Sequence, residues 1–269
     1  MTSVTAADYA WIRSSPVFRH AMDTGYTLTA VRGVAPEEVL RIMNAEPQGT
    51  CEGLEELIEE QDELIDPMDY RNESFLAGAF TVPGAGGDWT LVMQFDSGTG
   101  MQPRFLKALS AGGCAVVHSS NGGKPMDFFH WYADGECRTG FESPWSREGS
   151  SPDELNPLLL EVGFELTQDE DGTGVHVDAK AAVLALAERL TGVRVTEELL
   201  RDAEYRLGLV PEEPAEEWTT VVVDITDARG ERFHREFARE DVEAAMERAR
   251  AQAEAPMVIP GTLFPPPAP

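Results

Sequence analysis

The region from Ser74 to Phe141 constrains the fold of this chain more than any other segment. Within it, apolar and polar residues alternate with period two in five runs, which clusters of Gly, Pro, Asn and Asp separate. The runs are FLAGAFTV, WTLVMQF, CAVVHSS, MDFFHWYA and CRTGFE. Asp134-Gly135 between the last two tolerates the positive φ angles of a tight hairpin. The region therefore predicts strands of one antiparallel sheet.

Segments on both sides of this region predict helices and one more strand. YTLTAVRG, from Tyr26, alternates as a sixth strand, and Pro36 then lies in the first turn of a helix. Helical spacing of apolar residues predicts further helices in residues 8–20, 52–66, 104–113, 151–164, 180–192 and 196–210. Ser151 is a predicted N-cap, and Gly192 a predicted helix end. We therefore expect an α+β fold, an antiparallel sheet of five to six strands flanked by helices.

Composition divides the chain into a main domain and a short C-terminal part. Residues 1–210 form the predicted main α+β domain, and PEEPAEE at 211–217 reads as a linker because it lacks apolar side chains. Residues 218–254 predict a hairpin followed by a helix, a ββα appendage too small to bury much surface alone. Residues 255–269 form a proline-rich tail.

The strongest global feature is acidity. The formal net charge is −27, with a pI of about 4.4. A field of this sign repels nucleic acid and anionic lipid, so we expect neither as a partner. The helix at 52–66 concentrates the charge in Glu55, Glu56, Glu59 and Glu60. This acidic face either binds a basic protein or is simply a solvated helix surface.

Cysteine usage and hydropathy predict a cytoplasmic protein. Cys51, Cys114 and Cys137 form no C-x-x-C pair, and the N-terminus shows no basic segment followed by an apolar one. No apolar run reaches the ~18 to 20 residues of a membrane span. We therefore expect a reducing compartment and no contact with a membrane.

The sequence carries no recognisable catalytic, nucleotide or metal motif. G-x-S-x-G and the phosphate-binding glycine motif are missing, and the histidines lack metal-ligand spacing. A calcium loop beginning at Asp169 fails because Lys180 stands where a bidentate carboxylate is needed. We therefore expect no cofactor and no metal. His118, His130, Asp127 and Cys137 are the residues that neighbouring strands could bring together, unless their side chains lie on opposite faces of the sheet.

Aromatic residues gather between Phe128 and Trp145. Packing across neighbouring strands explains such a cluster by default. Alternatively, Trp131 and Trp145 are exposed and form part of a binding surface.

Several blocks of the chain are similar to an uncharacterised actinobacterial family with a domain of unknown function. They are YTLTAVRGVAPEEVLRIMNAEP, the strand beginning DWTL, LSAGGCAVVHSS, WYADGECRTGFES, PDELNPLLLEVGF and ALAERLTGVRVTEELL, the most specific of the six. The resemblance spans residues 8–208. The resemblance implies that the chain shares the fold and lineage of this family. It implies no activity and no functional residue. The acidic helix and the C-terminal additions depart from the family's usual form.

Three hypotheses of function follow. The first is a non-enzymatic protein that binds a basic protein partner through its acidic surface, as an immunity protein, an inhibitor or a regulatory subunit would. The second is an enzyme of unrecognised class, with a site near His118, His130 and Cys137. The third is a scaffold whose PPPAP tail binds an aromatic groove, although the tail lacks a nearby basic residue.

Overall fold

The computed structural model divides the chain into two units, Met1–Glu213 and Pro214–Pro269. It describes residues 4–64, 74–95, 97–122, 127–167, 177–211, 220–226 and 232–238, and single positions at 230, 240, 241, 244 and 248. The predicted linker at 211–217, the C-terminal helix and the proline-rich tail fall almost wholly outside these residues. Each unit is described below by itself.

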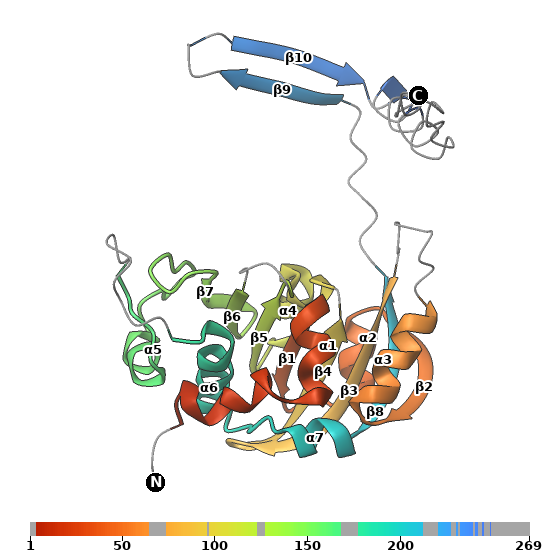
Figure 1. Ribbon diagram of the computed structural model, residues 1–269, viewed down its shortest axis with the longest axis vertical. Coiled ribbons are helices and arrows are strands. Elements are labelled where there is room, and N and C mark those ends of the chain that lie inside the picture. The colour runs from red at the N-terminus through yellow and green to blue at the C-terminus, as the bar shows by residue number, and fades with distance from the viewer. Residues whose placement is uncertain are drawn as a thin grey trace, which may run out of the picture. The chain divides into compact units, whose positions relative to one another are not determined.

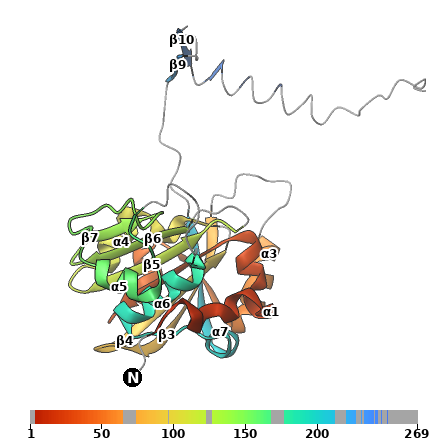
Figure 2. The same ribbon diagram turned by 60° about the vertical axis from the view of Figure 1, so that its left-hand side comes forward.

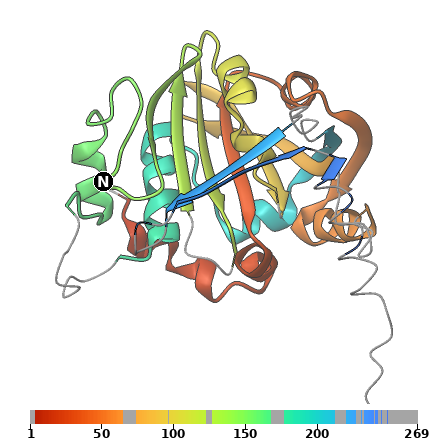
Figure 3. The same cartoon turned by 90° about the horizontal axis from the view of Figure 1, so that it is seen from above.

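The first unit is built on an eight-stranded sheet in the order β2-β8-β3-β4-β1-β5-β6-β7 (Figure 1). Every pair of neighbouring strands is antiparallel. The strands twist relative to one another, as Figure 3 shows from above. Their bounds are β1 Tyr26–Arg32, β2 Glu46–Glu52, β3 Ser74–Gly84, β4 Gly87–Phe95, β5 Cys114–Ser120, β6 Asp127–Ala133, β7 Glu136–Phe141 and β8 Glu204–Pro211.

The α+β class and the antiparallel sheet are confirmed, but the prediction of five to six strands is too low. β2 and β8 are the strands that the sequence pattern missed. β2 reads EPQGTCE, and only Cys51 of it is buried, so it shows no apolar alternation. β8 follows a helix so closely that residues 196–210 were predicted as one helix. The helix, α7 (Glu197–Asp202), ends before Glu204, where β8 begins.

Helices cover both faces of the sheet and divide the core in two. On the first face lie η1 Ala6–Arg13, α1 Pro16–Thr24, α3 Gly53–Leu64, α5 Asn156–Val162, α6 Ala179–Thr191 and α7 (Figure 2). They pack on strand residues such as Leu28, Met93 and Val116. On the second face, α2 (Pro36–Ile42) and α4 (Pro103–Leu109) pack on residues such as Val92 and Val117.

Local sequence signals correctly predicted two of these helix ends, at Gly192 and Thr196. Gly192 ends α6 in the left-handed conformation, at φ 69°. The Thr196 side chain caps α7 by accepting a hydrogen bond from the Leu199 N–H. The predicted N-cap at Ser151 is wrong, because α5 begins only at Asn156, with Pro157 in its first turn. The chain from 151 to 155 forms turns instead.

The described strands of the second unit, β9 (Thr220–Thr226) and β10 (Arg232–Ala238), form a hairpin. Its strands pair over their full length, with Arg232 opposite Thr226. Val222 and Phe233 are exposed large apolar side chains of this hairpin.

Candidate functional site

The four candidate catalytic residues of the sheet divide between its two faces. Register places His118 opposite Leu28, a residue of the first-face core. It places His130 opposite Val117, a residue of the second-face core. Because residues opposite each other on neighbouring strands point to the same side, the two imidazoles lie on opposite sides of the sheet.

Cys137 lies on the second face with His130, close to Tyr132. Burial raises the pKa of the Cys137 thiol, which keeps it protonated and a poor nucleophile. The four side chains therefore do not form one site.

The first face instead brings His118 and Asp127 together with two further residues. Lys180 of α6 donates from Nζ to both carboxylate oxygens of Asp127, over 2.7 Å and 3.0 Å. His118 Nε2 lies 3.5 Å from Asp127 Oδ1, a long distance for a hydrogen bond. On the other side of the ring, the Tyr26 hydroxyl lies 3.1 Å from His118 Nδ1. Tyr26, His118, Asp127 and Lys180 are called the buried polar cluster below.

Burial decides the charges in the buried polar cluster. The side chains of His118, Lys180 and Asp127 are 1%, 7% and 12% exposed. Burial lowers the pKa of His118, although Asp127 opposes this, so the imidazole is neutral at pH 7. Burial alone would raise the pKa of Asp127, but His118 and Lys180 lower it to about 2. The cluster is thus an ion pair between Asp127 and Lys180, flanked by a neutral histidine.

The Tyr26 hydroxyl supplies the hydrogen bond of His118 Nδ1. Burial raises the pKa of Tyr26 well above its ordinary value, so the phenol keeps its proton. It can donate that proton to Nδ1, which leaves the Nε2–H of the neutral ring facing Asp127. This tautomer follows from the neutral hydroxyl donor on one side of the ring and the carboxylate on the other.

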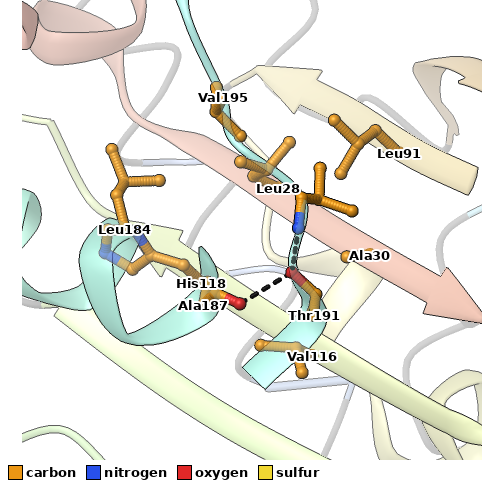
Figure 4. A pocket seen from close by; sticks show the side chains of 10 residues that line it. Leu28, Ala30, Leu91, Val116, His118, Leu184, Ala187, Thr191 and Val195 are labelled. Carbon is orange, nitrogen blue, oxygen red and sulfur yellow. Dashed lines mark hydrogen bonds between the residues drawn. The ribbon is translucent and has the colours of Figure 1, made fainter. Parts of the chain in front are cut away.

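The space beside the buried polar cluster is small and apolar. A cavity of about 20 Å³ lies between α6 and strands β1, β4 and β5, and His118 lines it (Figure 4). Its walls are mainly Leu28, Leu91, Val116 and Leu184. Thr191 also lines it, but its hydroxyl already donates to the Ala187 carbonyl. This volume can hold one water molecule and no substrate.

Sequence reasoning missed Tyr26 and Lys180 because each belongs to a regular pattern. Tyr26 alternates within a strand, and Lys180 reads as an ordinary charge at the start of a helix. The sequence gives no sign that Lys180 is buried. The position of Lys180 follows from the packing of α6 on the first face. Asp178 caps the N-terminus of this helix, and Arg13 donates to Asp178 from Nε and Nη2.

Two buried histidines and Asp127 predict an acid-sensitive fold. His118 and His130 have lowered pKa values because of burial, so the unfolded chain takes up protons first as the pH falls below about 6.5. The contribution of Asp127, whose pKa is about 2 against 3.8, is lost between about pH 4 and pH 2. We expect the free energy of unfolding, from urea titrations, to fall in two steps. Removing both imidazoles in a His118→Gln/His130→Gln variant should abolish the upper step, and an unchanged upper step would contradict this account.

The acidic face of α3 is exposed, as the sequence predicts. The four glutamates named above are exposed, and so are Asp62 and Glu63. Among the described residues, none of these six carboxylates forms an ion pair. Glu56 has a local role, because it accepts a hydrogen bond of 2.6 Å from the Glu52 N–H. The six residues are called the α3 acidic face below.

The two tryptophans suggested as binding residues lie at the other end of the sheet. Trp131 of β6 is half-buried and packs against the first-face core. Trp145 follows β7 and is 47% exposed. Since β7 and β2 are opposite edges of the sheet, Trp145 does not share a surface with the α3 acidic face.

Neither a metal centre nor a reactive thiol emerges in the part of the chain that the structure describes. In that part, no three His, Cys, Asp or Glu residues are placed to hold a metal ion. Burial raises the pKa of Cys51 to about 12 and also raises that of Cys114. The Asp169 loop lies mostly outside the described residues. No helix within them is long and apolar enough to cross a membrane.

Comparison with known proteins gives a family and no activity. Residues 2–215 match a family described as "Family of unknown function (DUF6461)". No curated protein and no solved structure matches the chain.

Proposed function

The chain belongs to the DUF6461 family, and we propose that it is a non-enzymatic binding protein whose α3 acidic face docks on a basic protein. The observation that carries this proposal is the lack of ion pairs on that face among the described residues. Glutamates on other helices do have arginine partners, such as Glu38 with Arg41 on α2 and Glu161 of α5 with Arg189. The α3 carboxylates are thus available to a partner.

The helix dipole favours Glu55 and Glu56 in the first turn of α3, but helix stability does not account for its other charges. Like charges four residues apart are destabilising, and α3 has three such pairs, Glu55/Glu59, Glu56/Glu60 and Glu59/Glu63. At about 0.2–0.5 kcal/mol each, these pairs cost about 1 kcal/mol. The last turn carries no basic residue, whereas the helix dipole favours positive charge there. A basic partner would relieve this repulsion and associate faster through electrostatic attraction.

The enzyme hypothesis has less support from the geometry. Its proposed residues lie on both faces of the sheet, and the cavity beside His118 is the size of one water molecule. The ion pair of Asp127 and Lys180 is better explained as a structural contact that holds α6 against β6. The narrower proposals, an immunity protein, an inhibitor or a regulatory subunit in an actinobacterial cytoplasm, differ only in which basic protein is bound.

Neutralising part of the α3 acidic face should weaken binding and strengthen the fold. The variant is Glu59→Gln/Glu60→Gln/Glu63→Gln, which keeps the hydrogen bond of Glu56, removes one charge from each of the pairs Glu55/Glu59 and Glu56/Glu60, and removes both charges of Glu59/Glu63. We expect its free energy of unfolding to rise by about 1 kcal/mol. Its association rate constant with the basic partner should fall by about tenfold. A loss of binding with a gain in stability cannot be explained by misfolding.

The partner is found by affinity capture of the tagged full chain from its native lysate at low and high salt, with mass spectrometry of the retained proteins. The purified partner is then titrated with each variant over a range of salt. The matched control is Glu136→Gln/Glu142→Gln/Glu165→Gln, three exposed glutamates elsewhere with the same change in net charge. Equal weakening by both variants, or no partner at either salt, would refute the proposal.

A further inference from the structure

A groove lies on the second face of the sheet, between α2 and the edge formed by β2 and β8. Its volume is about 670 Å³, which is within the range of pockets that bind small organic ligands. Apolar groups form much of its lining, from Leu40 of α2, from Ala45 and from Pro47 of β2. Leu207 of β8 also lines it, although this residue belongs to the first-face core. The groove is far larger than the cavity beside His118.

The backbone of the two strands helps to shape the groove. The pairing of β2 with β8 shifts between Pro47 and Gly49, an irregularity that bends an edge strand locally. Gly49 has a φ of 93° and open space where a side chain would begin. On β8, a Cβ at Gly208 would lie 2.8 Å from that of Ala45, so the glycine lets the chain after α2 approach the sheet. The walls therefore depend on two glycines.

The polar groups of the groove reverse the charge balance of the chain. The whole sequence has 21 basic and 48 acidic residues, whereas the groove is lined by Arg41, Arg206 and only one acid, Glu37. Arg206 Nε lies 3.1 Å from Glu37 Oε1. Arg41 Nε donates to Glu38 Oε2 over 2.7 Å. Both guanidinium groups are thus already in carboxylate-binding geometry at the mouth of an apolar groove.

We propose that this groove binds an amphipathic carboxylate, that is, a small molecule with one carboxylate and an apolar body. The apolar body lies against Leu40, Ala45 and Pro47, and its burial supplies the main driving force. The carboxylate takes the place of Glu37 or Glu38 on an arginine. This exchange costs little, because exposed ion pairs contribute little to stability.

The net charge of −27 does not prevent an anion from reaching the groove. At physiological ionic strength, charges more than about 8 Å away are largely screened. Nearby, Glu37 and Glu38 balance Arg206 and Arg41, so the local charge does not repel an anion. The proposal is independent of the α3 acidic face, because α3 packs on the first face and the groove lies on the second.

The test compares three probes with the same alkyl chain and different head groups: decanoate, decanol and decyltrimethylammonium. Each is titrated into the full chain below its micelle concentration, and backbone amide shifts are followed by NMR. We expect decanoate to bind most tightly and to shift the amides of α2, β2 and residues 206–207. The variant Thr50→Trp, which places a large side chain at an exposed lining position, should block all three probes.

Charge recognition is tested with the variant Arg41→Gln/Arg206→Gln. It should weaken decanoate binding by at least about tenfold and leave decanol binding unchanged. The matched control, Arg138→Gln/Arg194→Gln, removes two other arginines that contact carboxylates, one half-buried and one exposed, and should bind decanoate normally. Equal affinity for decanoate and decanol, tighter binding of the cation, or shifts outside the groove would overturn the proposal. Binding of a basic protein at α3 would be unaffected by any of these results.

Discussion

Replacing Asp127 by alanine is expected to lower the free energy of unfolding by about 3–5 kcal/mol. The substitution leaves the Lys180 ammonium inside the protein without the carboxylate that it contacts at 2.7 Å and 3.0 Å. Lys180 is buried, so water cannot easily replace that partner. His118 does not compensate, because burial keeps its ring neutral.

The measurement is urea unfolding of the single variants and of the double variant Asp127→Ala/Lys180→Met. Since an apolar side chain needs no charged partner, the double variant should be more stable than Asp127→Ala alone. This recovery is the sign of a direct interaction in a double-mutant cycle. If the two single effects simply add, the ion pair does not tie α6 to the sheet.

The double variant also separates the two functional hypotheses. A binding protein that uses the α3 acidic face should keep its partner when Asp127 and Lys180 are replaced together, because the fold is retained. An enzyme that uses His118 with Asp127 should lose its activity. Retention of partner binding by the double variant therefore favours the binding proposal.

Shortening Leu184 to alanine is expected to cost about 2–5 kcal/mol. Leu184 belongs to α6, is 1% exposed, and faces the cavity together with Leu28 and Val116 (Figure 4). The substitution removes three carbon atoms beside space that is already empty of protein, so neighbouring side chains lose contacts that only a rearrangement could restore.

Urea unfolding of Leu184→Ala at neutral pH measures this cost. Leu160→Ala is the matched control, because Leu160 is 57% exposed on α5 and should change stability by no more than about 0.5 kcal/mol. A loss below about 1 kcal/mol for Leu184→Ala would mean that neighbouring side chains readily fill the space left by the substitution. This result would contradict the tight packing of α6 on the first face.

The sequence by itself determined the elements that local physics controls. Alternation with period two located β1 and the five strands between Ser74 and Phe141, because each side chain of a strand points opposite to its neighbours. Gly192 and Thr196 located helix ends, because their conformational and hydrogen-bonding preferences act within one turn. The exposure of the α3 acidic face followed from helical spacing alone.

Only the tertiary structure decided what depends on pairing between distant segments. β2 is a strand because β8 pairs with it, and its own composition argues against a strand. The faces occupied by His118 and His130 depend on register, where a shift of one residue would exchange them. Likewise, Tyr26, Asp127 and Lys180 meet around His118 only once four segments, β1, β5, β6 and α6, pack together. Such contacts depend on side chains far apart in the sequence, whereas periodicity and capping report only on near neighbours.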